Sequence, residues 1–334
     1  MIKIAINGLG RIGRLVLRAA LERGQHFNIV ALNTLGNAET ICHLINYDSN
    51  HGRANINIAL KGCNITIGDK LVPMLNIPTP IEIPWGDFDI DVVLECSGKF
   101  TNYDQAYSHI VAGAKKVIVS APCENADRTI VVGVNHHTLK KEDKIISLGS
   151  CTTNALAPIA KVIYESFGIE TGYVTTIHSY TSDQNIVDSL HNDLRRARAA
   201  ALSIIPTSTG AASAISLVIP ELKGKLHGSA IRVPTANVSL IDFSFLSRKV
   251  MNEEMINDAV SKAASHDDFK NILGIATSKL VSIDFNHSTY SSIFDPFETK
   301  VTSPHFGRVL SWYDNEWAFV QRMLDCCELL KTVF

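Results

Sequence analysis

The stretch that decides the fold is Lys3-Ile4-Ala5-Ile6-Asn7-Gly8-Leu9-Gly10-Arg11-Ile12-Gly13. Its first residues, 3–6, are an apolar run that predicts a short buried strand, and the apolar positions after Gly13 recur at helical spacing. The three glycines stand at the G-x-G-x-x-G spacing of the dinucleotide-binding fingerprint, in the strand-turn-helix context that it needs. Gly8 permits the tight turn, Gly10 lets a pyrophosphate approach the backbone, and Gly13 lets the helix pack closely on the strand. The N-terminal part of the chain is therefore predicted to bind a nucleotide.

The residues that follow extend this pattern into a sheet. Further strands are expected at 28–33, 90–96, 116–120 and 144–148, with a helix over 103–112. Alternating strands and helices favour an α/β fold with a doubly wound parallel sheet of the Rossmann type. Ser97 and Ser120 stand just beyond two strand ends, where ligands collect in such sheets; the alternative is that they are ordinary turn residues.

Residue 34 bears on the choice of cofactor. The fingerprint has an acidic residue near this point, where it holds the ribose 2′-hydroxyl, and this chain has Thr34 instead. A carboxylate repels a 2′-phosphate, so its absence removes a barrier to NADP, although no arginine in this loop supplies a positive clamp. NAD and NADP both stay open as cofactors.

The second half of the chain has a different pattern. Strands are expected at 172–177, 238–245, 279–284 and 308–313, without long helices between successive strands. We therefore predict a mainly antiparallel sheet in an α+β catalytic domain. The predicted domains are a dinucleotide-binding domain over 1–150 and a catalytic domain over 151–314, with a C-terminal helix over 315–334.

Cys151 is the candidate nucleophile. It falls between the strand expected at 144–148 and a helix expected over 152–167, and a helix N-terminus favours the reactive thiolate. The alternative is a buried cysteine that acts as a small hydrophobe. His178 directly follows the strand expected at 172–177 and is a candidate base for that thiol; the alternative is a surface or hydrogen-bonded structural histidine. Spacing in the sequence does not decide whether the two side chains meet.

Two cationic segments are candidate anion sites. One is the run Asn192-Asp193-Leu194-Arg195-Arg196-Ala197-Arg198, which leads into Pro206-Thr207-Ser208-Thr209-Gly210-Ala211-Ala212, and the other contains Arg232. Hydroxyls and backbone N–H groups at a helix start suit a phosphate, and arginine adds a charged donor. The alternative is that these arginines are solvated or ion-paired surface groups.

Composition excludes several function classes. The chain has 334 residues, a net charge of -2 and a pI near 6.6, which leaves no basic field for nucleic acid or an anionic membrane. The first residues lead directly into a strand, and no apolar stretch reaches the roughly 20 residues of a membrane span, so we expect a cytoplasmic protein. Its seven cysteines show no repeated C-x-x-C spacing, which favours reduced thiols over disulfides or a zinc site.

Taken together, these segments resemble the glyceraldehyde-3-phosphate dehydrogenase family over essentially the whole chain. The matching motifs are Ile6-Asn7-Gly8-x-Gly10-Arg11-Ile12-Gly13, Tyr47-Asp48-Ser49-x-His51-Gly52, Ser150-Cys151-Thr152-Thr153-Asn154, His178-Ser179-Tyr180-Thr181, Asp193-Leu194-Arg195-Arg196-Ala197-Arg198, Thr209-Gly210-Ala211-Ala212, Ile231-Arg232-Val233-Pro234-Thr235 and Ser311-Trp312-Tyr313-Asp314-Asn315-Glu316.

The resemblance implies a role for each matching residue. Cys151 is then the nucleophile and His178 its base. Cofactor contacts fall on Asn7, Gly8, Gly10, Arg11, Ile12, Thr34, Ser97, Ser120 and Asn315, the last of which orients the nicotinamide amide. The substrate phosphate falls on Thr181, Asp183, Arg196 and Arg232, and inorganic phosphate on Ser150, Thr152, Thr209 and Gly210. No metal is implied.

The resemblance also implies the reaction and the assembly. Glyceraldehyde 3-phosphate is oxidised with NAD(P)+ and phosphate to 1,3-bisphosphoglycerate through a cysteine thioester, a step of glycolysis and gluconeogenesis. The family is usually a homotetramer, in which the loop over 179–204 lies near the cofactor of a neighbouring subunit. The helix over 315–334 is expected to dock back on the nucleotide-binding domain.

Departures from the family pattern keep alternatives open. Thr34 and the pair Ser189-Leu190 weaken the case for strict NAD specificity, and Ala155 replaces a second cysteine that is not the nucleophile. Erythrose-4-phosphate dehydrogenase is a sister enzyme echoed by Asp284-Phe285-Asn286-His287 and Arg322-Met323-Leu324-Asp325. A further alternative is a non-catalytic nucleotide-binding or moonlighting module, against which the complete set of site residues argues.

Overall fold

The structure, a computed structural model, describes residues 1–332. Its contacts divide the chain into two compact units. The first unit comprises Met1–Ile130, His136–Ser150 and the described residues from Val320 onward, and the second comprises Val131–Asn135 and Cys151–Phe319.

A parallel sheet forms the centre of the first unit. Its strand order is β11-β12-β10-β9-β1-β2-β8, and every neighbouring pair is parallel. The strands are β1 (Ile2–Asn7), β2 (Phe27–Asn33), β8 (Met74–Leu75), β9 (Val92–Glu95), β10 (Lys116–Val119), β11 (Arg128–Thr129) and β12 (Ile145–Ser147). The order reverses direction between β1 and β9, and ligands of doubly wound sheets bind beyond the carboxyl ends of the strands at such a point. The predicted Rossmann-type sheet is confirmed.

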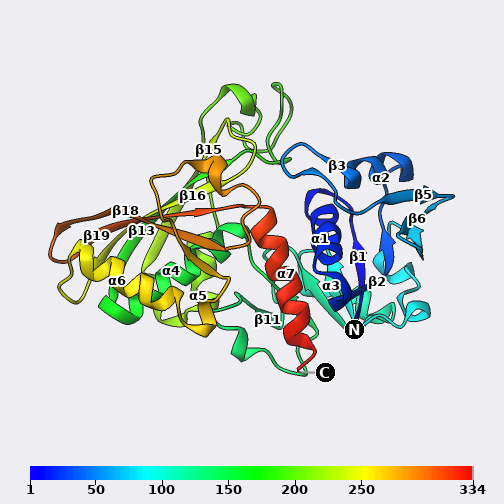
Figure 1. Ribbon diagram of the computed structural model, residues 1–334, viewed down its shortest axis with the longest axis horizontal. Coiled ribbons are helices and arrows are strands. Elements are labelled where there is room, and N and C mark those ends of the chain that lie inside the picture. Colours follow the sequence, from blue (N-terminus) through cyan, green and yellow to red (C-terminus); the bar gives the residue numbers. More distant parts are fainter. Residues whose placement is uncertain (333–334) are drawn as a thin grey trace. The chain divides into compact units, whose positions relative to one another are not determined.

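Helices and small sheets complete this unit (Figure 1). They are α1 (Arg11–Glu22), α2 (Ala38–Asn46), α3 (Tyr103–Val111), the pair β3 (Tyr47–Asp48) and β4 (Gly52–Arg53), and the three-stranded sheet β5 (Ile58–Lys61), β6 (Asn64–Ile67) and β7 (Lys70–Val72). Short 3-10 turns lie at η1 (Gly24–His26), η2 (Pro80–Glu82), η3 (Trp85–Phe88) and η4 (His136–Thr138). The final helix, α7 (Trp317–Leu330), contributes its residues from Val320 onward.

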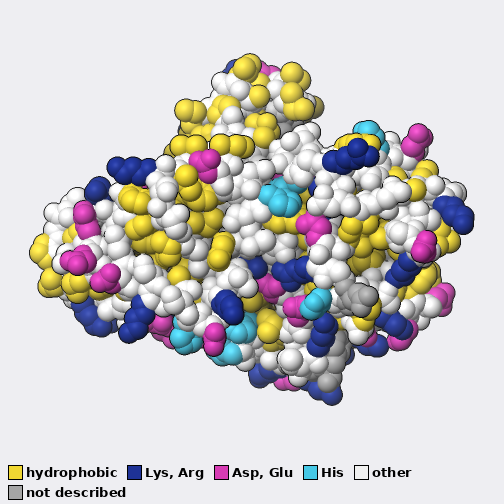
Figure 2. Space-filling model, in the orientation of Figure 1, with side chains coloured by type: hydrophobic (Ala, Val, Ile, Leu, Met, Phe, Trp, Pro, Cys, Tyr) yellow, Lys and Arg dark blue, Asp and Glu magenta, His cyan; other side chains and the backbone are white. Residues whose placement is uncertain are grey.

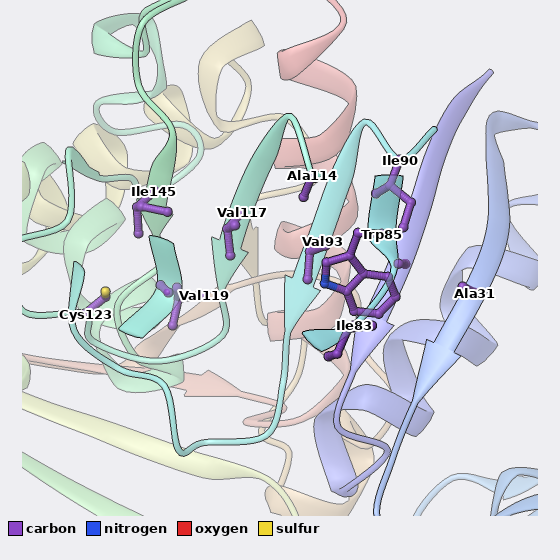
Figure 3. Close-up of a cluster of buried hydrophobic side chains, with 12 residues drawn as sticks. Ala31, Ile83, Trp85, Ile90, Val93, Ala114, Val117, Val119, Cys123 and Ile145 are labelled. Carbon is purple, nitrogen blue, oxygen red and sulfur yellow. The ribbon is translucent and has the colours of Figure 1, made fainter. Parts of the chain in front are cut away.

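One buried apolar cluster of this unit lies against β9, β10 and β12. Trp85, Val93, Val117 and Ile145 are fully buried, and α3 adds Ala106 to the same cluster. Figure 3 shows Val93, Val117, Val119 and Ile145 on these strands, with Ala31 on β2 and the Trp85 indole close to Val93. Continuous apolar runs on β9 and β10 are the pattern expected of a parallel sheet covered on both faces.

The second unit is built on a mixed sheet. Its strand order is β14-β15-β13-β16-β19-β18-β17; the pairs β13–β15 and β17–β18 are parallel and the remaining neighbours are antiparallel. The strands are β13 (Ile169–Ser179), β14 (Ile205–Thr207), β15 (Leu226–Val233), β16 (Ser239–Ser247), β17 (Leu273–Ile275), β18 (Ser292–Ser303) and β19 (Phe306–Tyr313). The predicted mainly antiparallel sheet is confirmed.

Helices pack on this mixed sheet because one face of its strands is apolar. β16 alternates buried and half-buried residues along its whole length, and α4 (Cys151–Phe167) packs on β16, β18 and β19. The other helices are α5 (Ala211–Val218) and α6 (Glu253–Ala264), with 3-10 turns η5 (Ala200–Leu202), η6 (Pro220–Leu222), η7 (Asp267–Phe269) and η8 (Ser282–Phe285). Within residues 1–332, no helix has both the length and the apolar character that crossing a membrane requires.

One predicted strand is wrong. The segment 279–284 forms no strand, and its second half belongs to the 3-10 turn η8. The Asp284 carboxylate accepts a hydrogen bond from the Val281 N–H at 2.9 Å, which closes a helical turn. Phe285 then stacks on Trp312, with 5.4 Å between ring centroids, so the apolar residues here fill a corner beside the sheet.

Candidate active site

Cys151 and His178 meet in the second unit. Cys151 is the first residue of α4 and is partly exposed, whereas His178 lies near the end of β13 and is buried. Its Nε2 atom lies 3.6 Å from Cys151 Sγ. The structure thus brings together the two side chains whose contact the sequence leaves undecided, in the geometry of a nucleophile beside a base.

The other ring nitrogen of His178, Nδ1, contacts the Ser179 carbonyl oxygen and the Arg232 guanidinium. Nδ1 lies 2.7 Å from the Ser179 carbonyl oxygen, and Arg232 Nη1 lies 2.7 Å from the same Nδ1. Arg232 also donates to that carbonyl at 3.0 Å, because β13 and β15 run parallel with His178 opposite Arg232. Nδ1 cannot donate to the carbonyl and accept from Arg232 at the same time. In the tautomer whose Nδ1–H donates to the carbonyl, Nε2 presents its lone pair to the thiol, which is what a base needs.

Burial sets the protonation state of this pair. Desolvation raises the pKa of the Cys151 thiol, although the Arg232 charge and hydrogen bonds from Thr152 oppose it. Desolvation and then the Arg232 charge lower the pKa of His178 to about 3. These two shifts favour a neutral thiol beside a neutral imidazole in the free site, whereas a helix N-terminus by itself favours the thiolate.

Tyr313 forms one wall of the site and was not predicted as a site residue. Its hydroxyl lies 3.0 Å from Thr152 Oγ1 and 2.8 Å from Thr176 Oγ1, and its ring stands edge-on to His178. The hydroxyl contact keeps the Thr152 side chain, expected to bind phosphate, inside the unit. The available signal was the position of Tyr313 at the end of an apolar strand, two residues before Asn315.

Three of the residues expected at the substrate phosphate lie together. Arg196 forms an ion pair with Asp183, and its Nε donates to Thr207 Oγ1 at 2.8 Å. The Asp183 N–H donates to Thr181 Oγ1 at 3.4 Å. Burial and then the charge of Arg232 lower the pKa of Arg196, so the two guanidinium groups lie close enough to repel each other. A dianion beside them would relieve that repulsion.

Of the residues expected to bind inorganic phosphate, some belong to the second unit and one to the first. Thr152 is in α4, and Thr209 and Gly210 precede α5, of which Gly210 is the N-cap. Thr209 Oγ1 accepts a hydrogen bond from the Ala211 N–H at 3.2 Å. Ser150 belongs to the first unit.

The fingerprint glycines of the first unit fit a bound dinucleotide. Gly8 has φ of +92°, and a Cβ there would lie 2.5 Å from the Ser97 nitrogen. A Cβ at Gly13 would overlap the Gly8 carbonyl oxygen, so helix α1 can approach the strand only with glycine at that position. No atom of the chain lies within 4 Å of the place where a Gly10 Cβ would stand, which leaves open the space that a pyrophosphate would take.

A buried carboxylate lies behind the fingerprint, and sequence reasoning missed it. Glu95, at the end of β9, accepts hydrogen bonds from Asn7 Nδ2 at 2.5 Å and from the Ser97 N–H at 2.7 Å. His109 Nε2 lies 3.0 Å from the same carboxylate, and the Trp85 indole N–H donates to His109 Nδ1 at 2.9 Å. The signal was an acidic residue at the end of an otherwise apolar strand.

The remaining predicted cofactor residues lie around the same sheet edge. Thr34 follows β2 and is buried, with its N–H donating to Leu75 O at 3.0 Å. Ile12 is in the first turn of α1, and the Ser120 N–H donates to Glu95 O at 3.0 Å. The Arg11 guanidinium pairs with Asp48 at 2.6 Å.

Asn315 lies in the second unit beside the His178 strand. Its Oδ1 accepts hydrogen bonds from Ser179 Oγ and Ser239 Oγ, each at 2.8 Å. Among residues 1–332, no group of three or more His, Cys, Asp or Glu side chains is arranged to hold a metal ion.

Two family models and several curated proteins match this chain. The family model described as "Glyceraldehyde 3-phosphate dehydrogenase, NAD binding domain" matches residues 2–103, and the one described as "Glyceraldehyde 3-phosphate dehydrogenase, C-terminal domain" matches residues 150–315. The chain is 51% identical over 325 residues to a glyceraldehyde-3-phosphate dehydrogenase of Xanthobacter flavus, covering 97% of both chains. It is 49% identical over 325 residues to one of Geobacillus stearothermophilus, covering 97% of this chain and 96% of the relative.

Proposed function

This chain belongs to the glyceraldehyde-3-phosphate dehydrogenase family, and on that premise we propose that it oxidises glyceraldehyde 3-phosphate to 1,3-bisphosphoglycerate with NAD(P)+ and inorganic phosphate. The observation that carries the proposal is the distance of 3.6 Å between Cys151 Sγ and His178 Nε2. The first unit binds the cofactor and the second carries the chemistry. The reaction is a step of glycolysis and gluconeogenesis.

In the first half of the reaction Cys151 adds to the aldehyde. Its thiol proton passes to His178 Nε2 as Sγ bonds to the carbonyl carbon, and the oxygen then takes that proton to give a hemithioacetal. The hydroxyl proton returns to Nε2 when the carbon loses its hydride. A bound nicotinamide supplies the hydride acceptor. The carbon, oxidised by two electrons, stays on Cys151 as a thioester.

In the second half inorganic phosphate releases the product. A phosphate oxygen bonds to the thioester carbon and the bond to Sγ breaks, which leaves an acyl phosphate. The departing thiolate takes up the proton held by His178. Thr209, Gly210, Thr152 and Ser150 are the residues proposed to hold the incoming phosphate, through hydroxyls and backbone N–H groups at a helix start.

Arg232 is proposed to link substrate binding to the base. With Thr181, Asp183 and Arg196, it forms the proposed site of the substrate phosphate, and its guanidinium contacts His178 Nδ1. The Arg232 charge is one of the two causes that lower the pKa of His178. A dianionic phosphate beside Arg232 offsets that charge, and so makes His178 a stronger base once substrate is bound.

NAD or NADP is the proposed cofactor, and Thr34 is the residue that keeps NADP open. This buried residue follows β2, where a carboxylate would exclude a 2′-phosphate. The proposed cofactor residues are Asn7, Gly8, Gly10, Arg11, Ile12, Thr34, Ser97 and Ser120 in the first unit and Asn315 in the second.

A cytoplasmic homotetramer is proposed as the working form. The segment 181–204 exposes Ile186, Leu190, Leu194 and Leu202, and Leu190 is 99% exposed. Figure 2 shows hydrophobic side chains gathered on the projection that this segment forms, which Figure 1 draws as green loops. Such an exposed apolar patch is a typical subunit contact.

The test is the appearance of reduced cofactor from glyceraldehyde 3-phosphate, with NAD+ or NADP+ and with or without phosphate. We expect reduction that depends on phosphate, and its loss in Cys151→Ser. Cys63→Ser, which changes an exposed cysteine elsewhere, is the matched control and keeps full activity. A Cys151→Ser variant as active as wild type would refute the nucleophile, and faster turnover of erythrose 4-phosphate would reassign the substrate.

A further inference from the structure

Two buried serine hydroxyls converge on the amide of Asn315. Ser179 ends β13 and Ser239 begins β16, and each donates to Asn315 Oδ1 at 2.8 Å. Neither serine exposes more than 1% of its surface. The oxygen of this amide is therefore fully engaged inside the unit.

The hydrogen-bond directions fix which end of the amide is free. Ser239 Oγ accepts the Ser179 N–H at 3.1 Å, so its own proton is directed to Asn315. With two donors on Oδ1, the Nδ2 group turns away from both serines, and no partner for it lies among the residues that the structure describes. Asp314 holds the adjoining backbone in place, because it accepts the N–H groups of Glu316 and Trp317 at 2.9 and 2.7 Å.

Ser179 also connects this amide to the base. Its carbonyl oxygen lies 2.7 Å from His178 Nδ1, and its N–H is held by Ser239. One residue thus orients Asn315 through its side chain and His178 through its backbone. Removal of the Ser239 hydroxyl affects the hydrogen bond to Asn315 and also the Ser179 backbone that contacts His178. Removal of the Ser179 hydroxyl affects only the hydrogen bond to Asn315.

We propose that Ser179 and Ser239 are positioning residues: they lock the Asn315 amide so that its Nδ2–H2 group faces the cofactor's carboxamide oxygen, and Ser239 anchors the carbonyl that orients His178. This rests on the proposed function, in which Asn315 contacts the nicotinamide. A locked donor binds without the cost of selecting one of two amide orientations.

A second buried serine pair provides the control. Ser292 on β18 and Ser311 on β19 are bonded at 2.6 Å in the same sheet, and both are buried. Ser292→Ala removes a hydroxyl from a like environment without touching Asn315 or His178. A general effect of losing a buried hydroxyl would appear in all three alanine variants.

The experiment measures the dissociation constant of NAD+ by calorimetry and the pH profile of Cys151 alkylation by iodoacetamide without cofactor. Loss of one hydrogen bond to a polar group predicts a roughly five- to ten-fold weaker affinity for NAD+ in Ser179→Ala and Ser239→Ala. We expect Ser239→Ala alone to shift the alkylation profile, and Ser239→Thr, which keeps the hydroxyl, to restore it. Ser292→Ala should change neither quantity.

Each outcome decides the matter. The positioning role would be overturned if both variants bound NAD+ within two-fold of wild type. It would also be overturned if Ser292→Ala lost as much NAD+ affinity as they do. In either case, turnover by the wild-type enzyme would leave the proposed function standing. A wild type that binds NAD+ but oxidises no sugar phosphate would refute the proposed reaction, and the pattern of affinities would still decide the role of the serines. A wild type that binds no dinucleotide would overturn both.

Discussion

At His178, burial favours the neutral form of the imidazole. Burial and then Arg232 lower the pKa of this imidazole, while burial raises the pKa of the Cys151 thiol. These shifts favour a neutral pair, in which the thiol becomes a nucleophile when its proton moves from Sγ to Nε2. The Arg232 charge acts on both groups, since it lowers the pKa of the thiol as well as that of the imidazole.

The depressed pKa of His178 makes stability depend on pH. Its folded pKa of about 3 lies below the unfolded value near 6.5, so between these values the unfolded chain binds a proton that the folded chain does not. The contribution to stability is therefore complete above pH 6.5 and is lost as the pH falls toward 3. When the pH falls from 7 to 5, we expect the free energy of unfolding of His178→Asn to decrease by roughly 2 kcal/mol less than that of wild type.

Urea unfolding at these two pH values measures the difference. His227→Asn is the control, because His227 is exposed on β15. Equal acid sensitivity of wild type and His178→Asn would show that the folded imidazole takes up its proton at the ordinary pH.

At the scale of elements, two glycines in the turn from β1 into α1 have different roles: Gly13 is needed for packing, and Gly10 is proposed to leave room for the cofactor. Gly13→Ala places a Cβ against the Gly8 carbonyl, so we expect a melting temperature several degrees lower, in line with a cost of roughly 1–3 kcal/mol for overpacking. Gly10→Ala meets no atom of the chain within 4 Å, and its φ of -70° suits alanine. We expect it to melt as wild type does and to bind NAD+ at least ten-fold more weakly. Thermal denaturation and calorimetry give both quantities, and normal NAD+ affinity in Gly10→Ala would contradict the placement of the pyrophosphate.

The ends of β1 and β9 are joined by the Glu95 carboxylate. Asn7, Ser97 and His109 all direct hydrogen-bond donors at it, and Trp85 fixes the His109 tautomer from the other side. Glu95→Gln keeps the shape but points an NH2 group at some of these donors, so we expect a loss of roughly 2–3 kcal/mol in unfolding free energy. Glu82→Gln, at an exposed glutamate of the same unit, is the control. Denaturant unfolding is the measurement, and an unchanged midpoint would show that these hydrogen bonds to Glu95 add little to the free energy of unfolding.

At the scale of the whole molecule, exposed leucines predict association. A side chain such as Leu202, 86% exposed on the segment 181–204, gains stability when it is covered by another subunit. We expect light scattering to give about four times the chain mass of 36.5 kDa, and Leu202→Asp to give smaller species. Val111→Asp, at an exposed apolar residue of α3, should leave the mass unchanged. A wild-type monomer would refute the proposed tetramer.

The sequence by itself determined the features that depend on near neighbours in the chain. Glycine spacing at 8, 10 and 13 and the apolar runs of β9, β10 and β12 are local patterns, so the Rossmann-type sheet and the position of Cys151 at a helix start could be predicted. The segment 279–284 shows the limit of that reasoning, because an apolar run does not say whether its residues extend or turn. There a single side-chain cap at Asp284 decided the conformation.

Only the tertiary structure decided the chemistry of the site. The Cys151–His178 contact depends on how α4 meets β13, and the Arg232–His178 contact on the register of β13 with β15. The pKa shifts of Cys151 and His178 come mainly from burial, which is a property of the folded unit and not of residue order. Tyr313, Glu95 and the serines around Asn315 were missed for the same reason: hydrogen bonds between distant strands leave no local pattern in the sequence.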